Sequence, residues 1–184
     1  LVEKALKILP SSPVVIDVGT GSGAIAVSLA FYNREALVYA TDRCGEALEV
    51  ARRNAVRHGV SDRIFLYRGD LLKPLKACLE AGGADLVAAN LPYIAECDLP
   101  QLPREVRMFE PQLALDGGAD GLEHYRRLIP EAAVFLKREG CLLLEIGWDQ
   151  GPGAAALFDA QDWDVKVLQD LAGYDRLVVA RFKR

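Results

Sequence analysis

Residues 14–23, VVIDVGTGSG, join a β-branched run to a loop in which every second residue is glycine. The run predicts a buried strand, and the residues from Ala24 to Asn33 after the loop predict a helix. A glycine-rich loop between a strand and a helix brings a ligand close to the free N–H groups at the helix start. The pattern alone is weak evidence, because it fits NAD nearly as well as any other nucleotide-like ligand.

Strands and helices alternate along most of the chain. Besides the strand at 14–18, the apolar runs predict strands at 36–42, 64–68, 84–89, 141–146, 163–169 and 174–182. Helices are predicted at 1–9, 24–33, 46–58, about 74–81, 121–138 and 154–160. This order predicts an α/β fold in which a mostly parallel sheet is covered by helices on both faces. The last two strands have no helix between them and should pair as an antiparallel hairpin.

The carboxyl ends of the parallel strands are where a ligand is expected. In such sheets ligands bind beyond these ends, at the point where the strand order reverses. Residues 91–118 follow the fourth strand, contain four prolines and are expected to form a long loop. A loop of that length in a compact domain is usually functional or mobile. The polar residues that end each strand are therefore the first candidates for a functional site.

The composition is that of one globular domain, with 184 residues of which 51% are hydrophobic and 26% are charged. A net charge of −4 argues against direct binding to a nucleic-acid backbone. No apolar run approaches the roughly 20 residues of a membrane-spanning helix. The four cysteines are scattered without a paired spacing or a histidine cluster, which predicts a reducing, cytoplasmic setting and no metal site.

Three acidic residues stand at or just after predicted strand ends and suit different parts of one ligand. Asp17 precedes the glycine loop, where a carboxylate would repel a pyrophosphate but pair with an ammonium group. Asp42 could accept hydrogen bonds from two ribose hydroxyls, and Asp70 could accept one from an adenine amino group while Leu71 packs on the ring. An ammonium, a ribose and an adenine together indicate S-adenosylmethionine. The predicted cofactor-binding residues are Asp17, Gly19, Thr20, Gly21, Ser22, Gly23, Asp42, Asp70, Leu71 and Asn90.

The tetrad Asn90-Leu91-Pro92-Tyr93 follows the fourth strand and supplies the predicted catalytic residues. Pro92 fixes its own φ angle and biases Leu91 toward an extended conformation, which stiffens the turn. The amide oxygen of Asn90 and the carbonyl of Leu91 then form a cluster of acceptors without positive charge. Such a cluster suits a planar –NH2 group, which has two hydrogens to donate. Tyr93 would pack on the plane of that group.

Together these motifs resemble the class I methyltransferases, which use S-adenosylmethionine. More narrowly, three further stretches resemble the HemK/PrmC family of protein-(glutamine-N5) methyltransferases, which modify peptide chain release factors. These stretches are residues 109–115, FEPQLAL, residues 117–128, GGADGLEHYRRL, and residues 142–147, LLLEIG. The resemblance implies a seven-stranded sheet with an antiparallel last strand, a release factor as protein partner, and methylation of a glutamine side-chain amide.

The resemblance also implies that residues 1–184 form a single methyltransferase domain, cut from a longer protein that carries an N-terminal helical substrate-binding domain. One position departs from the family, since Leu91 stands where the first proline of Asn-Pro-Pro-Tyr is usual. Asn-Leu-Pro-Tyr is similar to the tetrad of the rRNA adenine-N6 dimethyltransferases.

Several alternatives stay open on the sequence. Adenine-N6 methylation of RNA or DNA is the runner-up, on the strength of the tetrad. A nicotinamide dehydrogenase fits the glycine loop but not Asp17 or the tetrad, and an inactive cofactor-binding scaffold does not explain an intact tetrad. The sequence does not separate a release factor from a ribosomal protein as substrate, and it leaves the oligomeric state open. His58 and His124 are interpreted as solvated or helix-capping side chains.

Overall fold

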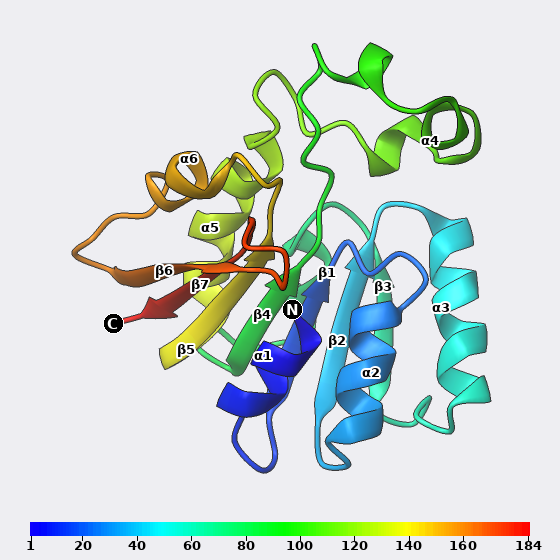
Figure 1. Ribbon diagram of the computed structural model, residues 1–184. Helices are drawn as coiled ribbons and strands as arrows, with labels where there is room; N and C mark the ends of the chain where they lie inside the picture. Colours follow the sequence, from blue (N-terminus) through cyan, green and yellow to red (C-terminus); the bar gives the residue numbers. More distant parts are fainter.

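Seven strands form one sheet in the order β3-β2-β1-β4-β5-β7-β6 in the computed structural model, which describes residues 1–184 (Figure 1). Neighbouring strands from β3 through β5 pair in parallel, whereas β7 lies antiparallel between β5 and β6. The predicted α/β fold and terminal hairpin are confirmed. The strands are β1 Val14–Val18, β2 Leu37–Asp42, β3 Ile64–Arg68, β4 Ala84–Ala89, β5 Leu136–Glu145, β6 Trp163–Gln169 and β7 Asp175–Phe182.

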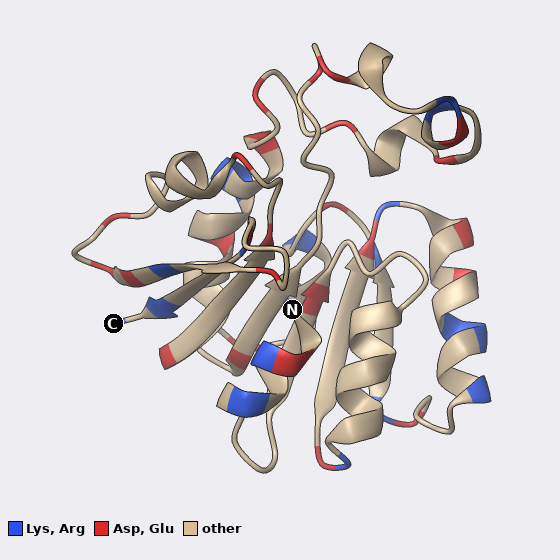
Figure 2. Cartoon of the chain, in the orientation of Figure 1, with Lys and Arg blue, Asp and Glu red and all other residues tan.

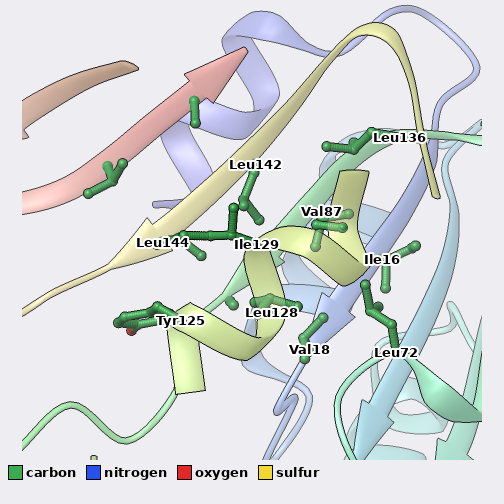
Figure 3. Close-up of a cluster of buried hydrophobic side chains, with 14 of the residues drawn as sticks. Ile16, Val18, Leu72, Val87, Tyr125, Leu128, Ile129, Leu136, Leu142 and Leu144 are labelled. Carbon is green, nitrogen blue, oxygen red and sulfur yellow. The ribbon is translucent and has the colours of Figure 1, made fainter. Parts of the chain in front are cut away.

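Helices pack on both faces of the sheet and close two separate hydrophobic clusters. Successive side chains of a strand point to opposite faces, so Ile16 of β1 joins one cluster and Val15 joins the other. Figure 3 shows the first cluster, in which Ile129 of α5 points toward Leu142 and Leu144 of β5. Burial on both faces explains why the central strands β1 and β4 are mostly apolar. The α-helices are α1 Val2–Ile8, α2 Ala24–Tyr32, α3 Gly45–Arg57, α4 Arg104–Phe109, α5 Glu123–Phe135 and α6 Gly151–Ala155.

The strand order reverses between β1 and β4. The chain moves outward from β1 through β2 to β3 and then returns to place β4 on the other side of β1. Val18 of β1 lies opposite Ala89 of β4. The glycine loop after Val18 and the tetrad after Ala89 therefore leave the same edge of the sheet side by side, which is the position expected of a ligand site.

Three predicted helices differ from the structure. The expected helix at 74–81 is a short 3₁₀ helix, η1 Lys73–Ala77, with a proline in its first turn. The expected helix at 121–138 ends at Phe135, and β5 begins at Leu136 rather than at Cys141. Leu136 pairs with Ala84 while Cys141 pairs with Leu86, so the polar residues between them bulge out of the sheet.

The last predicted helix, at 154–160, is shorter and lies earlier in the structure, where α6 begins at Gly151 and ends at Ala155. Pro152 lies in the first turn of α6, where proline is well accommodated. A side chain on Gly151 would overlap the carboxylate of Asp175 in β7. Close packing of the helix start against β7 thus explains the glycine.

Residues 91–118 are not a structureless loop, because they contain η2 Leu99–Gln101, α4 and η3 Gln112–Ala114. The two ends of the segment are joined by backbone hydrogen bonds: the Ile94 N–H donates to the Leu115 carbonyl at 3.1 Å, and the Gly117 N–H donates to the Ile94 carbonyl at 2.9 Å. The residues between these ends extend beyond the carboxyl ends of the strands, where Figure 1 shows them in green around α4. No helix of the chain combines the length and apolarity that crossing a bilayer requires.

Candidate active site

A cavity of about 410 Å³ opens at the carboxyl ends of the parallel strands. It is bounded by the glycine loop, by the residues that follow β2, β3 and β4, and by η3 from the segment above. The structure brings together in its wall ten residues predicted from the sequence: Gly19, Thr20, Gly21, Ser22, Asp42, Asp70, Leu71, Asn90, Leu91 and Pro92. Asp17, Gly23 and Tyr93 do not line it.

Asp17 lies behind the cavity wall and is fully buried. Its Oδ2 accepts hydrogen bonds from the Thr20 hydroxyl at 2.6 Å and from the Ala26 N–H at 3.0 Å, while its Oδ1 has no partner. Burial raises the pKa of Asp17 to about 6, and the two hydrogen bonds offset only part of that rise. The carboxylate therefore ties the glycine loop to the start of α2, and its pairing with a cofactor ammonium stays a prediction.

The glycine loop is shaped by positive φ angles and close neighbours. Gly19 has a φ of +68°, and a Cβ there would lie 2.6 Å from Cδ2 of Leu91. Gly23 has a φ of +82°, and a Cβ there would lie 3.0 Å from the Cβ of Ala51 in α3. Glycine suits both positions because other residues rarely adopt this conformation. The side chain of Leu91 thus packs over Gly19 of the loop. Leu91 is the residue that stands where the family usually has a proline.

Asp42 connects the glycine loop to the start of α3. Its Oδ2 accepts from the Gly21 N–H and its Oδ1 accepts from the Cys44 N–H, both at 2.8 Å. A carboxylate has about four lone-pair sites, so each oxygen can still accept a hydrogen bond from a ligand. Asp42 therefore fixes two loops of the cavity and keeps acceptor capacity toward its interior.

Asp70 lines the cavity between two cations. Lys73 donates to its Oδ2 at 2.7 Å, and Arg127 of α5 also pairs with Oδ2. The hydrogen bond from Lys73, together with Arg127, lowers the pKa of Asp70 and keeps it ionised. Leu71 follows with a φ of +50°, which is rare for a residue other than glycine. An ionised acceptor and an apolar side chain thus stand together at the end of β3.

The tetrad presents two uncharged acceptors. Asn90 is exposed and its carboxamide makes no hydrogen bond within the chain. The hydroxyl of Tyr125 lies within hydrogen-bonding distance of two carbonyl oxygens, that of Leu91 at 3.4 Å and that of Glu145. Burial raises the pKa of Tyr125, so it stays a neutral donor. Because a carbonyl oxygen has two lone pairs, the carbonyl of Leu91 can accept a second hydrogen bond beside that from Tyr125.

Tyr93 lies outside the cavity wall, and its backbone is enclosed by the glycines of residues 117–121. A Cβ on Gly117 would lie 2.8 Å from the Cα of Tyr93, and a Cβ on Gly121 would overlap its carbonyl oxygen. That carbonyl accepts a hydrogen bond from Nε2 of Gln150 at 2.8 Å, while Oε1 of Gln150 accepts from the Gly147 N–H. Two of the stretches that carry the family resemblance thus hold the tetrad from behind.

Several cavity residues were not predicted. Arg43, Cys44 and Ala47 line it beside Asp42, and Pro111, Leu113 and Ala114 line it from the segment above. His124, interpreted as solvated or capping, is half-buried in the wall and lies 3.1 Å from the carbonyl of Asp116. The FEPQLAL stretch was a signal for the second group, but nothing in the local sequence places the first turn of α5 at the cavity.

A family model described as a methyltransferase domain matches residues 10–148, which cover the glycine loop, the tetrad and the start of α5. The chain belongs to this methyltransferase domain family. The predicted class I methyltransferase fold is confirmed. The matched range also contains every residue predicted for cofactor binding and catalysis.

Relatives in the family narrow the resemblance. The methyltransferase domain is 45% identical to the release factor glutamine methyltransferase of Nitratidesulfovibrio vulgaris over 98% of this chain and 62% of that protein. It is 48% identical to that of Moorella thermoacetica over 92% of this chain and 59% of that protein. The resemblance to the release factor methyltransferases is confirmed. This chain spans about three-fifths of the length of these curated relatives.

Solved structures share the fold at low identity. A ribosomal protein L11 methylase from Lactobacillus delbrueckii superimposes with a TM-score of 0.68 and 24% identity, covering 100% of this chain and 75% of that one. TrmN from Thermus thermophilus gives a TM-score of 0.70 at 23% identity, over 99% of this chain and 48% of that one. An RNA methyltransferase from Salinibacter ruber, solved with S-adenosyl-L-homocysteine, gives 0.62 at 18% identity over 100% and 90%.

Proposed function

We propose that the methyltransferase domain transfers a methyl group from S-adenosylmethionine to the side-chain amide nitrogen of a glutamine in a protein. One observation carries the proposal: two cavity-lining residues offer uncharged acceptors, the Asn90 carboxamide without a partner in the chain and the Leu91 carbonyl with one lone pair left beside its contact to Tyr125. Both groups are uncharged acceptors, and a primary amide has two hydrogens to donate. The site is therefore matched to a neutral –NH2 group.

The residues around the cavity fit S-adenosylmethionine. Asp42 has acceptor capacity for ribose hydroxyls, Asp70 and Leu71 suit an adenine, and the glycine loop suits the amino-acid portion. The Thr41 hydroxyl, on a residue of the same wall, is buried without a hydrogen-bond partner, as expected of a wall that holds a polar ligand. When bound, S-adenosylmethionine supplies an electrophilic methyl group on its sulfonium.

The residues of the tetrad act on the nucleophile. An amide nitrogen is a poor nucleophile because its lone pair is delocalised into the carbonyl. Acceptance of its two N–H bonds by Asn90 and Leu91 orients the nitrogen and adds electron density to it. Holding two reactants in line is worth up to about 7–11 kcal/mol of a reaction barrier. The proton of the product can leave to water after transfer, so no general base is needed beforehand.

The charge of the segment above the strand ends favours a protein over a nucleic acid as substrate. Residues 91–120 contain six acidic and two basic residues, and Figure 2 shows acidic positions along the segment above the strand ends. Such an acidic segment repels the phosphates of RNA or DNA, and this repulsion counts against the adenine-N6 alternative. The relatives named as release factor glutamine methyltransferases support a peptide chain release factor as the partner. Four free cysteines support a cytoplasmic setting.

The test is mass spectrometry of a glutamine-containing release factor after incubation with this protein and S-adenosylmethionine. We expect a gain of one methyl group on a glutamine amide, and Asn90→Ala should abolish it. Calorimetry with S-adenosylhomocysteine should show that Asn90→Ala still binds the cofactor product. Asn33→Ala is the matched control, because Asn33 lies beyond the end of α2, far along the chain from the tetrad. Full activity of Asn90→Ala, or transfer to RNA or DNA instead, would refute the proposal.

A further inference from the structure

The turn after β3 is strained and is held from outside its own segment. Leu71 has a φ of +50° and its side chain is 6% exposed, so a branched residue occupies the left-handed region at the cavity wall. Such conformations persist only where the surrounding structure enforces them. The contacts of Asp70 and Leu72, on either side of Leu71, therefore help to maintain the turn, together with the backbone hydrogen bond from the Lys73 N–H to the Asp70 carbonyl.

Two residues of α5, one helical turn apart, make those contacts. Arg127 pairs with Oδ2 of Asp70, and the carboxylate of Glu131 accepts from the Leu72 N–H at 3.1 Å. Their spacing of four places both side chains on the same face of the helix. Arg127 and Glu131 thus bracket Leu71, across about sixty positions of sequence.

We propose that Arg127 and Glu131 are positioning residues for the recognition of adenine, and that they hold the turn so that Oδ1 of Asp70 faces the exocyclic amino group. Arg127 and Lys73 both occupy Oδ2, and Oδ1 receives no hydrogen bond from the chain. An ionised oxygen without a protein donor at the wall of a cavity is available to an N–H donor of the ligand. This inference rests on the proposed use of S-adenosylmethionine.

Lys73 cannot replace the α5 residues in this role. It lies on the same short segment as Asp70, and its side chain is 57% exposed, so it moves with the turn. Arg127 and Glu131 instead belong to a helix whose Tyr125, Leu128 and Ile129 are buried against the sheet (Figure 3). The same helix carries His124 in the cavity wall and places the Tyr125 hydroxyl near Leu91. Helix α5 therefore fixes the position of the proposed adenine site relative to the tetrad.

The experiment is calorimetry with two ligands, S-adenosylhomocysteine and its analogue with hydrogen in place of the amino group at C6 of the purine. The wild-type protein should prefer the amino compound by about tenfold or more, as expected for a hydrogen bond to a charged acceptor. Arg127→Met and Glu131→Ala should lower affinity for the amino compound and bring this preference close to one. Glu131→Gln keeps an acceptor and should retain most of the preference, and Arg127→Lys should lie in between.

A second measurement is made on the protein without ligand. Hydrogen exchange at the Leu72 amide should accelerate in Arg127→Met and Glu131→Ala, whereas Arg52→Met, an exposed arginine of α3, should match the wild type in both assays. An unchanged ligand preference in folded Arg127→Met and Glu131→Ala would overturn the inference and leave the proposed function standing. Failure of the wild-type protein to bind S-adenosylhomocysteine at all would overturn both.

Discussion

Replacing Asp17 with asparagine should change how the stability of the protein depends on pH. The carboxyl is completely buried, its Oδ1 has no partner, and burial raises its pKa from 3.8 to about 6. A difference of roughly two pKa units at about 1.4 kcal/mol each corresponds to about 3 kcal/mol. Solvent does not screen the charge of this carboxylate, because the group is inaccessible to water.

The sign of the pH dependence depends on whether the folded or the unfolded state holds the proton of Asp17. Between about pH 4 and pH 6 the folded protein keeps Asp17 protonated, while the unfolded chain has already released that proton. The contribution of Asp17 to the free energy of unfolding therefore falls as pH rises through this window, and stays about 3 kcal/mol lower above it. Asparagine has no charge to bury, so the free energy of unfolding of Asp17→Asn does not fall in this way as pH rises. Its stability relative to the wild type should rise by about 3 kcal/mol across the window.

Urea unfolding followed by circular dichroism at several pH values from 4 to 7.5 measures this difference. The comparison uses the change of the difference with pH, so a constant offset from the new amide hydrogens cancels. All other titrating groups are shared by the two proteins and cancel as well. Equal urea m-values would confirm that the same surface is exposed in both. A difference between the two proteins that is constant with pH would refute the view of Asp17 as a desolvated carboxylate.

Two further predictions concern the tetrad. Gly121→Ala, at a φ of +75°, would press a methyl group into the carbonyl of Tyr93 and the amide of Gln150; a shift of about 1 Å should slow transfer about 100-fold with little loss of S-adenosylhomocysteine binding. Gly173→Ala, at a φ of +86° with no neighbour in reach, is the matched control. Equal kinetic effects of the two variants would contradict the argument. Leu91→Pro should keep transfer within about tenfold of the wild type, because the acceptor is a backbone carbonyl, and should lower the free energy of unfolding in urea by about 1 kcal/mol. A loss as large as that of Asn90→Ala would show that the Leu91 side chain itself is required.

The sequence by itself determined the architecture and most of the cavity wall. The β-branched run at 14–18, the glycines after it and the polar residues at the ends of β2, β3 and β4 are local patterns. A parallel sheet brings all carboxyl ends to one edge, so Asp42, Asp70 and Asn90 could be placed together without coordinates. The roles of these residues in binding and catalysis stay predictions, as does the assignment of residues 1–184 to a single domain.

Only the tertiary structure decided which residues support that wall. It placed Asp17 behind the glycine loop, left Tyr93 out of the cavity wall, and enclosed the Tyr93 backbone between Gly117 and Gly121. It also brought Arg127 to Asp70, 57 positions away in sequence. The physical reason is that periodicity and turn chemistry report on neighbours within a few residues. A side chain's burial and its hydrogen-bond partners depend instead on segments that meet only when the chain packs.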